Sequence, residues 1–312
     1  MLRSSFYEYS LAGALRVFGE DAPEFLQSQF SNDLGGLEAG QLAYGLWLDV
    51  KGKVVADSWV LRDGPEDFRL FSEDCAGGLI REKLERHIIA DDVEIEASGE
   101  REALRLIGED LEAVAGQLGV PVPGPGRFAV SAGQGASLFR GRCARAPSME
   151  LVFVSGEARD AFKASLAGIC ELERLSESLA QLERIRAGVP LVPRELGPAD
   201  LPGEGGLVPA AVSLTKGCFL GQEVVARMHH VGRAQRGLFV VSGAGALPEV
   251  PSELLSPEGR RAGELRSAYR GDSGWTGVAL LKLRAVKPGD ELRSFDEPAR
   301  IAGPLAAESS KH

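Results

Sequence analysis

The chain has 312 residues, of which 44% are hydrophobic and 26% charged, as is typical of a soluble globular protein with two or three domains. The formal net charge of -10 disfavours a nucleic-acid-binding coat, which needs an excess of basic residues. No run approaches the length of an uncharged membrane span. The basic segment 227–236 is more typical of a solvated helix face than of a nucleic-acid site. We therefore expect no direct binding to nucleic acid or to a membrane.

Cysteine spacing excludes two kinds of site. The four cysteines are Cys75, Cys143, Cys170 and Cys218, and none belongs to a CxxC pair, which argues against structural zinc. A disulfide framework is not expected in so large a chain with so few cysteines. The N-terminus has no apolar secretory segment. We predict free thiols, no metal site, a cytoplasmic location, and a monomer or weak dimer.

The hydrophobic pattern of the first half predicts short helices alternating with half-polar strands. Such strands favour an α+β architecture, with helices on one face of antiparallel sheets, over a buried parallel sheet. The predicted helices cover residues 21–33, 77–89, 109–119 and 156–168. The predicted strands are a hairpin over 41–61 with its turn at Lys51–Lys53, and 68–72, 92–97, 103–108, 136–141 and 150–155.

The hydrophobic pattern of the second half predicts a helix in its first part and strands in its last part. Residues 171–188 carry leucine and isoleucine at helical spacing from Leu172 to Ile185, and Gly188 is typical of a helix end, so we predict one helix there. Beyond residue 233 short apolar runs alternate with glycine and proline. This pattern predicts a small all-β domain, either a barrel or a sandwich.

The segment KGCFLGQE, residues 216–223, surrounds Cys218 with features of a reactive thiol. Lys216 would favour the thiolate, and the two glycines would let a ligand approach closely. Gln222 and Glu223 begin a run that can open a helix, whose positive end would also favour the thiolate. The alternative is a buried free cysteine that acts as a small hydrophobe. The sequence contains no GxSxG, GxxxxGK[ST] or HExxH motif.

This segment is similar to the K-G-C-[FY]-x-G-Q-E signature of the YgfZ-type proteins. These are folate-binding proteins related to the aminomethyltransferase, or T-protein, of the glycine cleavage system. Residues 21–34, 48–61 and 184–192 resemble the family's T-N-D element, its K-G-[KR] hairpin and its R-I-E-A-G-[IV]-P segment. The resemblance implies an α+β, T-protein-like ring of three domains around a central cavity, with a C-terminal β-barrel.

The resemblance also implies a domain division. Residues 1–232 would form the folate-binding-like region, built of two interleaved α+β subdomains. One subdomain would join residues 1–45 with 150–232, and the other would comprise 46–149. Residues 233–306 would form the C-terminal barrel.

In function, the family assists the assembly or repair of iron–sulfur clusters, and through client [4Fe–4S] enzymes it supports tRNA modification. Cys218, aided by Lys216, would carry this activity, and Gln222, Glu223 and Arg227 would shape its site. Partners would be iron–sulfur assembly proteins or client enzymes, and a cluster would be held only transiently. The T-protein usually has aspartate or asparagine where this chain has Cys218. The residues therefore favour a maturation factor, with a tetrahydrofolate-dependent aminomethyltransferase-like enzyme as the alternative.

The resemblance further implies tetrahydrofolate in the central cavity, near Asn32, Asp57, Arg184 and Arg186. In related proteins a glutamate at the third position of R-x-E-x-G accepts hydrogen bonds from the pterin, whereas Arg186 can only donate. We therefore expect weak folate binding. Either Glu183 or another carboxylate would replace the missing acceptor, or Arg186 would pair with the glutamate tail of the ligand or be held out of the cavity by Glu183. Asp57 is either equivalent to a carboxylate of the transferases or an ordinary strand-surface aspartate.

Overall fold

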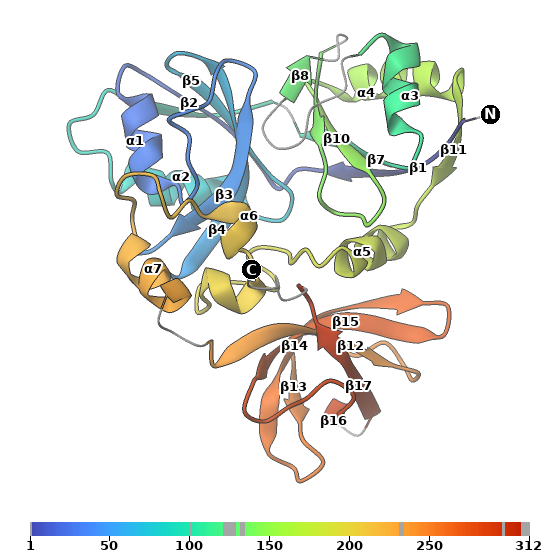
Figure 1. Ribbon diagram of the computed structural model, residues 1–312. Coiled ribbons are helices and arrows are strands. Elements are labelled where there is room, and N and C mark those ends of the chain that lie inside the picture. Colours follow the sequence, from blue (N-terminus) through green and yellow to red (C-terminus); the bar gives the residue numbers. More distant parts are fainter. Residues whose placement is uncertain are drawn as a thin grey trace.

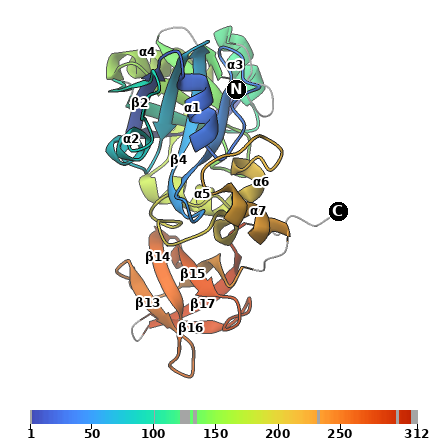
Figure 2. The same ribbon diagram turned by 90° about the vertical axis from the view of Figure 1, so that its left-hand side faces the viewer.

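The chain folds into three bodies: two sheets with helices packed on them, and a closed barrel (Figure 1). Figure 2 shows that the helical segments preceding the barrel lie between it and the sheets. The predicted α+β architecture with a C-terminal β-barrel is confirmed. The computed structural model describes residues 2–99, 101–120, 129–131, 135–230, 234–294 and 297–306.

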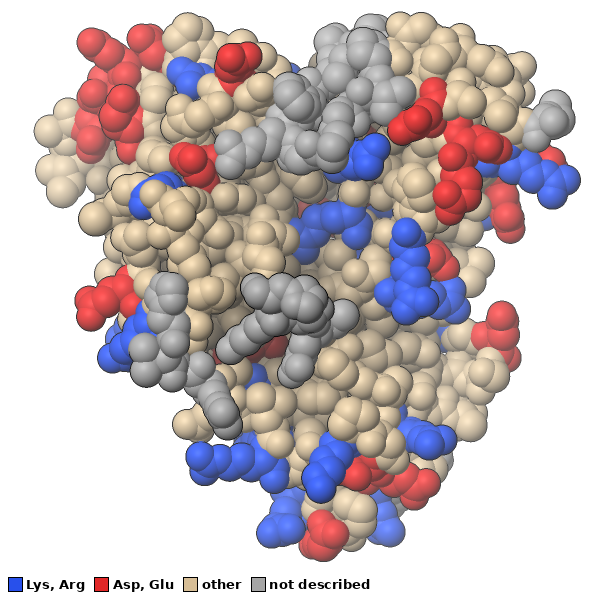
Figure 3. Space-filling model, in the orientation of Figure 1, with Lys and Arg blue, Asp and Glu red and all other residues tan. Residues whose placement is uncertain are grey.

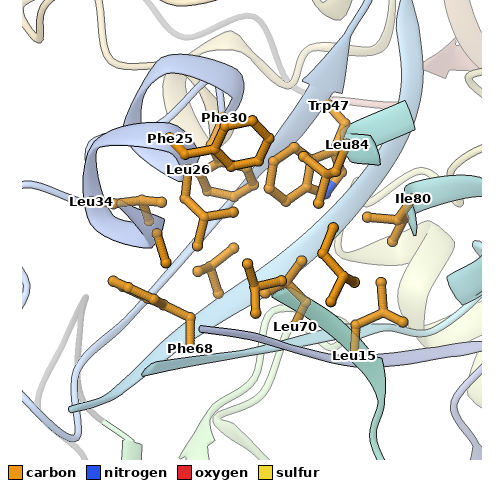
Figure 4. Close-up of a cluster of buried hydrophobic side chains, with 14 of the residues drawn as sticks. Leu15, Phe25, Leu26, Phe30, Leu34, Trp47, Phe68, Leu70, Ile80 and Leu84 are labelled. Atoms are coloured by element: carbon orange, nitrogen blue, oxygen red, sulfur yellow. The ribbon is translucent and has the colours of Figure 1, made fainter. Parts of the chain in front are cut away.

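The first sheet has five strands and is antiparallel throughout. Two strands form the predicted hairpin, and Gly52 in its turn has a φ of 69°, which favours glycine. Two helices cover one face, and Figure 4 shows their side chains pointing toward those of the strands. Phe30 and Trp47 are fully buried there, with ring centroids 4.7 Å apart. In sheet order the strands are β3 (Leu42–Leu48), β4 (Val54–Gly64), β5 (Asp67–Ser72), β2 (Gly13–Phe18) and β6 (Glu94–Ala97), and the helices are α1 (Ala22–Gln29) and α2 (Gly77–Glu85).

The second sheet has six strands and includes the N-terminal strand. Its outer pair, which brings Leu2 opposite Cys170, is parallel, whereas all other pairs are antiparallel. Phe162 and Leu166 of one covering helix and Val114 of the other are buried against the sheet. In order the strands are β11 (Cys170–Arg174), β1 (Leu2–Ser10), β7 (Glu102–Ile107), β10 (Ser148–Phe153), β9 (Ala136–Arg140) and β8 (Ala129–Ser131), and the helices are α3 (Leu111–Leu118) and α4 (Gly156–Ala167).

The barrel has six strands and its own buried apolar core. Helix α5 (Glu177–Arg186) packs on the barrel, where the Cδ1 atom of Leu182 lies close to Gly271. Within the described ranges we find no helix long and apolar enough to cross a membrane. In order the barrel strands are β12 (Arg236–Gly243), β15 (Gly274–Lys282), β14 (Arg261–Gly271), β13 (Ser252–Leu255), β16 (Glu291–Ser294) and β17 (Glu297–Pro304); the helices between sheets and barrel are α5 (Glu177–Arg186), η1 (Pro202–Gly205), α6 (Val208–Ala211) and α7 (Gln222–His230).

The prediction of one helix over 171–188 is wrong. Leu172 lies in β11, which extends along the edge of the second sheet beside β1. Helix α5 begins only after Ser176, whose hydroxyl accepts a hydrogen bond from the backbone N–H of Leu179. The leucine spacing therefore ran across a strand and a helix, and the capping serine marks the true boundary.

The sheets also divide the chain differently from the predicted subdomains. Residues 13–97 build the first sheet, whereas residues 2–10 and 102–174 build the second. A boundary at residue 45 would cut through β3, which pairs with β4 along its whole length. The sequence analysis did not assign β1 and β2, and the chain passes from one sheet to the other between them.

Candidate functional site

A cavity of about 50 Å³ lies where the two sheets meet the segment that follows α5. Its apolar wall contains a row of aromatic rings, in which Trp59 contacts Tyr44 and Phe139 at centroid distances of 5.4 and 5.1 Å. Residues 189–192 close a third side. We call this space the central cavity.

Asp57 lines this cavity, as the resemblance implied. The hydroxyl of Tyr44 donates to its Oδ2 at 2.7 Å, and that of Ser72 donates to its Oδ1 at 3.1 Å. Burial raises the pKa of Asp57 from 3.8 to about 6, although both hydrogen bonds favour the charged form. Asp57 is therefore not a strand-surface aspartate. It is a half-buried carboxylate that can exchange a proton near neutral pH.

The raised pKa of Asp57 predicts a pH-dependent stability. The folded protein holds this proton more tightly than the unfolded chain, so the stability contribution is complete below about pH 4 and is lost as the pH rises through about 6. We expect the stability of wild type relative to Asp57→Asn to fall by about 2 kcal/mol between about pH 4.5 and about pH 8. Urea unfolding at several pH values measures this change. Asp272→Asn, at an exposed turn aspartate, is the control, and parallel pH profiles for wild type and Asp57→Asn would refute the shift.

Arg105 and Glu150 form an ion pair in the cavity wall that the sequence analysis did not predict. They lie opposite each other on β7 and β10, and the Arg105 side chain is 1% exposed. Its Nε donates to Glu150 Oε1 at 2.6 Å, and its Nη2 donates to Glu73 Oε2 at 2.7 Å. Each charge interrupts an apolar strand, where an unpaired charge is rare. A charge within an apolar strand therefore predicts that the charged residue is paired, but it does not identify the residue with which it pairs.

Arg184 also reaches the cavity wall, but its guanidinium is occupied by the protein itself. The group is fully buried, with Nη2 donating to Glu195 Oε1 at 2.7 Å and Nη1 donating to Glu195 Oε2 at 2.9 Å. Its Nε donates to Gln181 Oε1 at 2.6 Å. The pair joins α5 to the segment after it, so Arg184 has a structural role, which the resemblance did not imply.

Arg186 is not among the residues that line the cavity. Its side chain is 56% exposed, and Nη1 donates to Glu183 Oε1 at 2.6 Å. Of the two alternatives for Glu183, the geometry corresponds to the one in which this carboxylate holds Arg186 away from the cavity.

Cys218 differs from the other three thiols in its exposure. Cys75, Cys143 and Cys170 are buried, whereas Cys218 is exposed in the loop before α7. Burial raises the pKa of Cys75 to about 12 and that of Cys143 to about 11, which keeps both as unreactive thiols. The alternative that Cys218 is a buried small hydrophobe is therefore wrong.

Lys216 anchors the Cys218 loop to the end of α1. Its Nζ donates to the carbonyl oxygens of Gln27, Phe30 and Asn32 at 2.6, 2.7 and 2.9 Å. Burial lowers its pKa to about 8, and the three carbonyls favour the ammonium because a neutral amine has only two N–H donors. These bonds use all three donors. They give Lys216 a structural role that the sequence analysis did not predict.

The two glycines of the motif have different surroundings. Gly221 has a φ of +83°, and a Cβ there would lie 2.6 Å from the carbonyl oxygen of Asp49. Gly217 has no such φ, and a Cβ there would meet no atom within 4 Å. The fold therefore requires Gly221 but not Gly217.

We expect Gly221→Ala to lower the free energy of unfolding by about 2–4 kcal/mol, because it adds both backbone strain and a clash. Gly217→Ala should change it by less than about 1 kcal/mol. Urea unfolding of the two variants provides a matched comparison within one loop. Similar losses in both would show that the loop does not pack as described.

The remaining predicted site residues are Asn32, Gln222, Glu223 and Arg227. Asn32 bridges backbone groups, since its Nδ2 donates to the Tyr44 carbonyl oxygen at 2.7 Å. Gln222, Glu223 and Arg227 lie on α7, where Glu223 and Arg227 are exposed. Of the predicted residues, Asp57 and Arg184 line the cavity, whereas Arg186 lies outside it.

Comparisons with known proteins agree with this fold. Residues 3–118 match the GCVT N-terminal domain, and residues 235–308 match the CAF17 C-terminal beta-barrel domain. The "tRNA-modifying protein YgfZ" of Colwellia psychrerythraea (strain 34H / ATCC BAA-681) is 28% identical over 279 residues, which are 86% of this chain and 82% of that protein. The protein of the same name from Escherichia coli (strain SE11) is 25% identical over 294 residues, covering 90% of this chain and 86% of that protein.

A solved structure shares the fold. The glycine cleavage system aminomethyltransferase T from Bartonella henselae superposes with a TM-score of 0.75 and 20% identity, covering 98% of this chain and 87% of that one. The chain therefore carries one segment that matches a GCVT N-terminal domain and one that matches a CAF17 C-terminal beta-barrel, and it is similar along most of its length to the YgfZ-type proteins, as the sequence analysis predicted.

Proposed function

We propose that the protein assists the assembly or repair of iron–sulfur clusters in other proteins, with Cys218 as the reacting thiol, and thereby supports tRNA modification. The observation that carries the proposal is the exposure of Cys218 in a loop where three neighbouring residues serve the fold. Lys216, Phe219 and Gly221 each have a packing or anchoring role. Cys218 has none, and an exposed thiol can reach another protein.

The chemistry limits how Cys218 can act. A [4Fe–4S] cluster is normally held by four thiolates, and this loop supplies one. Cys218 would therefore share a cluster with a client enzyme or an assembly protein, or would contact it briefly. The partners would be proteins of the iron–sulfur pathway in the cytoplasm. Relatives named for tRNA modification support this proposal, because enzymes that thiolate tRNA depend on such clusters.

A complementation experiment tests the proposal. The protein is expressed in an Escherichia coli strain that lacks its own YgfZ-type protein, and the modified nucleosides of its tRNA are quantified by mass spectrometry. We expect wild-type protein to restore the methylthiolated nucleosides above the level of the empty vector. Equal levels with protein and vector, despite soluble expression, would contradict the proposal.

Asp57 favours the second candidate, a tetrahydrofolate-dependent aminomethyltransferase-like enzyme. A carboxylate with a pKa of about 6 suits proton transfer near neutral pH. Tetrahydrofolate is the proposed ligand in both readings, with only part of the molecule inside this cavity of about 50 Å³, and with weak affinity because Arg186 replaces an acceptor. Detection of folate-dependent one-carbon transfer that is lost in Asp57→Asn but kept in Cys218→Ser would favour the enzyme.

A further inference from the structure

Two buried arginine nitrogens at the central cavity have no partner among the described residues. They are Nη1 of Arg105 and Nη1 of Arg142. Guanidinium groups can only donate, so each of these atoms requires an acceptor from outside. A buried polar group without a hydrogen bond is costly, and a charged one more so. The cavity therefore has two unmet donors, both contributed by the residues that build the second sheet.

The charges around the cavity leave Arg142 without an ion pair. Arg105 pairs with Glu150 and Glu73, and Arg184 and Arg194 have carboxylate partners of their own. Within the described part of the chain no carboxylate lies at ion-pair distance from Arg142, and its guanidinium carbon lies 3.8 Å from the centre of the Tyr44 ring. The nearby carboxylate of Asp57 interacts with this charge without forming an ion pair, and water could accept from Nη1 but would add no negative charge.

Basic atoms also lie on the surface at the junction of the two sheets (Figure 3). The protein is acidic overall, with a net charge of -10. On the face shown in Figure 3, however, Lys and Arg atoms lie between the two upper lobes, and acidic atoms lie on the lobes themselves. Such a field would attract an anion toward the junction.

We propose that the cavity binds the carboxylate group of an organic acid, which accepts hydrogen bonds from Nη1 of Arg105 and Nη1 of Arg142. A planar carboxylate has two oxygens that match guanidinium donors. Its single negative charge can pair with Arg142, and it meets less repulsion from Asp57 and Glu73 than a phosphate dianion would. This inference concerns the cavity and does not depend on the reaction proposed for Cys218.

The size of the cavity limits what can enter. Since a water molecule needs about 10–15 Å³ by the same measure, the volume of about 50 Å³ holds a group of roughly four non-hydrogen atoms. Acetate has this size. Two sources remain: a free small acid, or the carboxylate end of a larger ligand such as a glutamate-bearing folate whose remainder lies outside.

The test is a titration with sodium acetate in a carboxylate-free buffer, followed by saturation-transfer NMR. We expect wild-type protein to bind acetate with a Kd of about 1 mM, as a ligand of this size permits. Neutral acetamide at the same concentration should bind at least about tenfold more weakly, because it carries no charge to pair with Arg142.

Arg142→Met supplies the matched variant, because it keeps the length of the side chain and removes the donors. It should weaken acetate binding at least about tenfold, with circular dichroism confirming the fold. Equal affinity of wild type and variant, or of acetate and acetamide, would overturn the proposal, as would no binding of acetate. p-Aminobenzoylglutamate distinguishes the sources: displacement of acetate at lower concentration supports the end of a larger ligand, and failure to displace it supports a free small acid.

Discussion

Replacement of Glu195 by glutamine should lower the free energy of unfolding by about 3–5 kcal/mol, a magnitude typical of breaking a buried ion pair from one side. Glu195 and Arg184 are both fully buried and joined by two hydrogen bonds. The variant keeps the shape of the side chain but leaves the Arg184 charge unpaired in the interior. Urea unfolding measures the change.

The position of Glu195 adds to this effect. Its Oε2 accepts from the backbone N–H of Leu191 at 2.9 Å, and its Oε1 accepts from the hydroxyl of Ser267 on β14. One carboxylate therefore joins α5, the segment that closes the cavity, and the barrel. Loss of its charge weakens all of these bonds, because hydrogen bonds to ionised groups are the stronger ones.

The same helix offers a matched control. Glu183 pairs with Arg186 on the surface of α5, where the two side chains are 29% and 56% exposed. Glu183→Gln should change the stability by less than about 1 kcal/mol, since exposed pairs contribute little. A double variant, Arg184→Met with Glu195→Gln, should recover part of the loss because no buried charge remains. Equal losses in Glu183→Gln and Glu195→Gln would contradict the description of this pair.

Local pattern was enough to predict much of the fold. The hairpin around Gly52 and the helix after Asp21 were predicted because their residues carry the turn or the helical period within a few positions, although Asp21 makes no side-chain cap hydrogen bond. The segment 171–188 was predicted wrongly, because the leucine spacing of helix α5 continues into strand β11. Strands β1 and β2 have partners 50 to 170 residues away, as the pairing of Leu2 with Cys170 shows, and so lack a local signal.

The candidate site was predictable only in part, for the same reason. Cys218 and Asp57 were found because a motif or a resemblance points to them. The pairing of Arg105 with Glu150 depends on which strands become neighbours, and no local pattern states that. The structural role of Lys216 could not be predicted either, because its acceptors are carbonyl oxygens at the end of α1, far away in the sequence. Motif residues that look reactive can therefore be anchors.

The second large effect is expected for Cys218→Ser. Serine has nearly the same size, and an exposed side chain contributes little to stability, so the variant should unfold within about 0.5 kcal/mol of wild type. It lacks the thiolate that serves as nucleophile and as a soft ligand for iron–sulfur chemistry. The function should therefore be lost while the fold remains. A variant that also unfolded would indicate that Cys218 is packed rather than exposed.

The most direct test of the account is the tRNA complementation assay carried out with this variant. Cys218→Ser, Thr215→Ala at an exposed neighbour, and wild type are expressed at equal soluble levels in the strain without its own YgfZ-type protein. We predict methylthiolated nucleosides at wild-type level for Thr215→Ala and at least about tenfold lower for Cys218→Ser, near the empty vector. Wild-type levels with Cys218→Ser would contradict the account and show that the protein acts without this thiol.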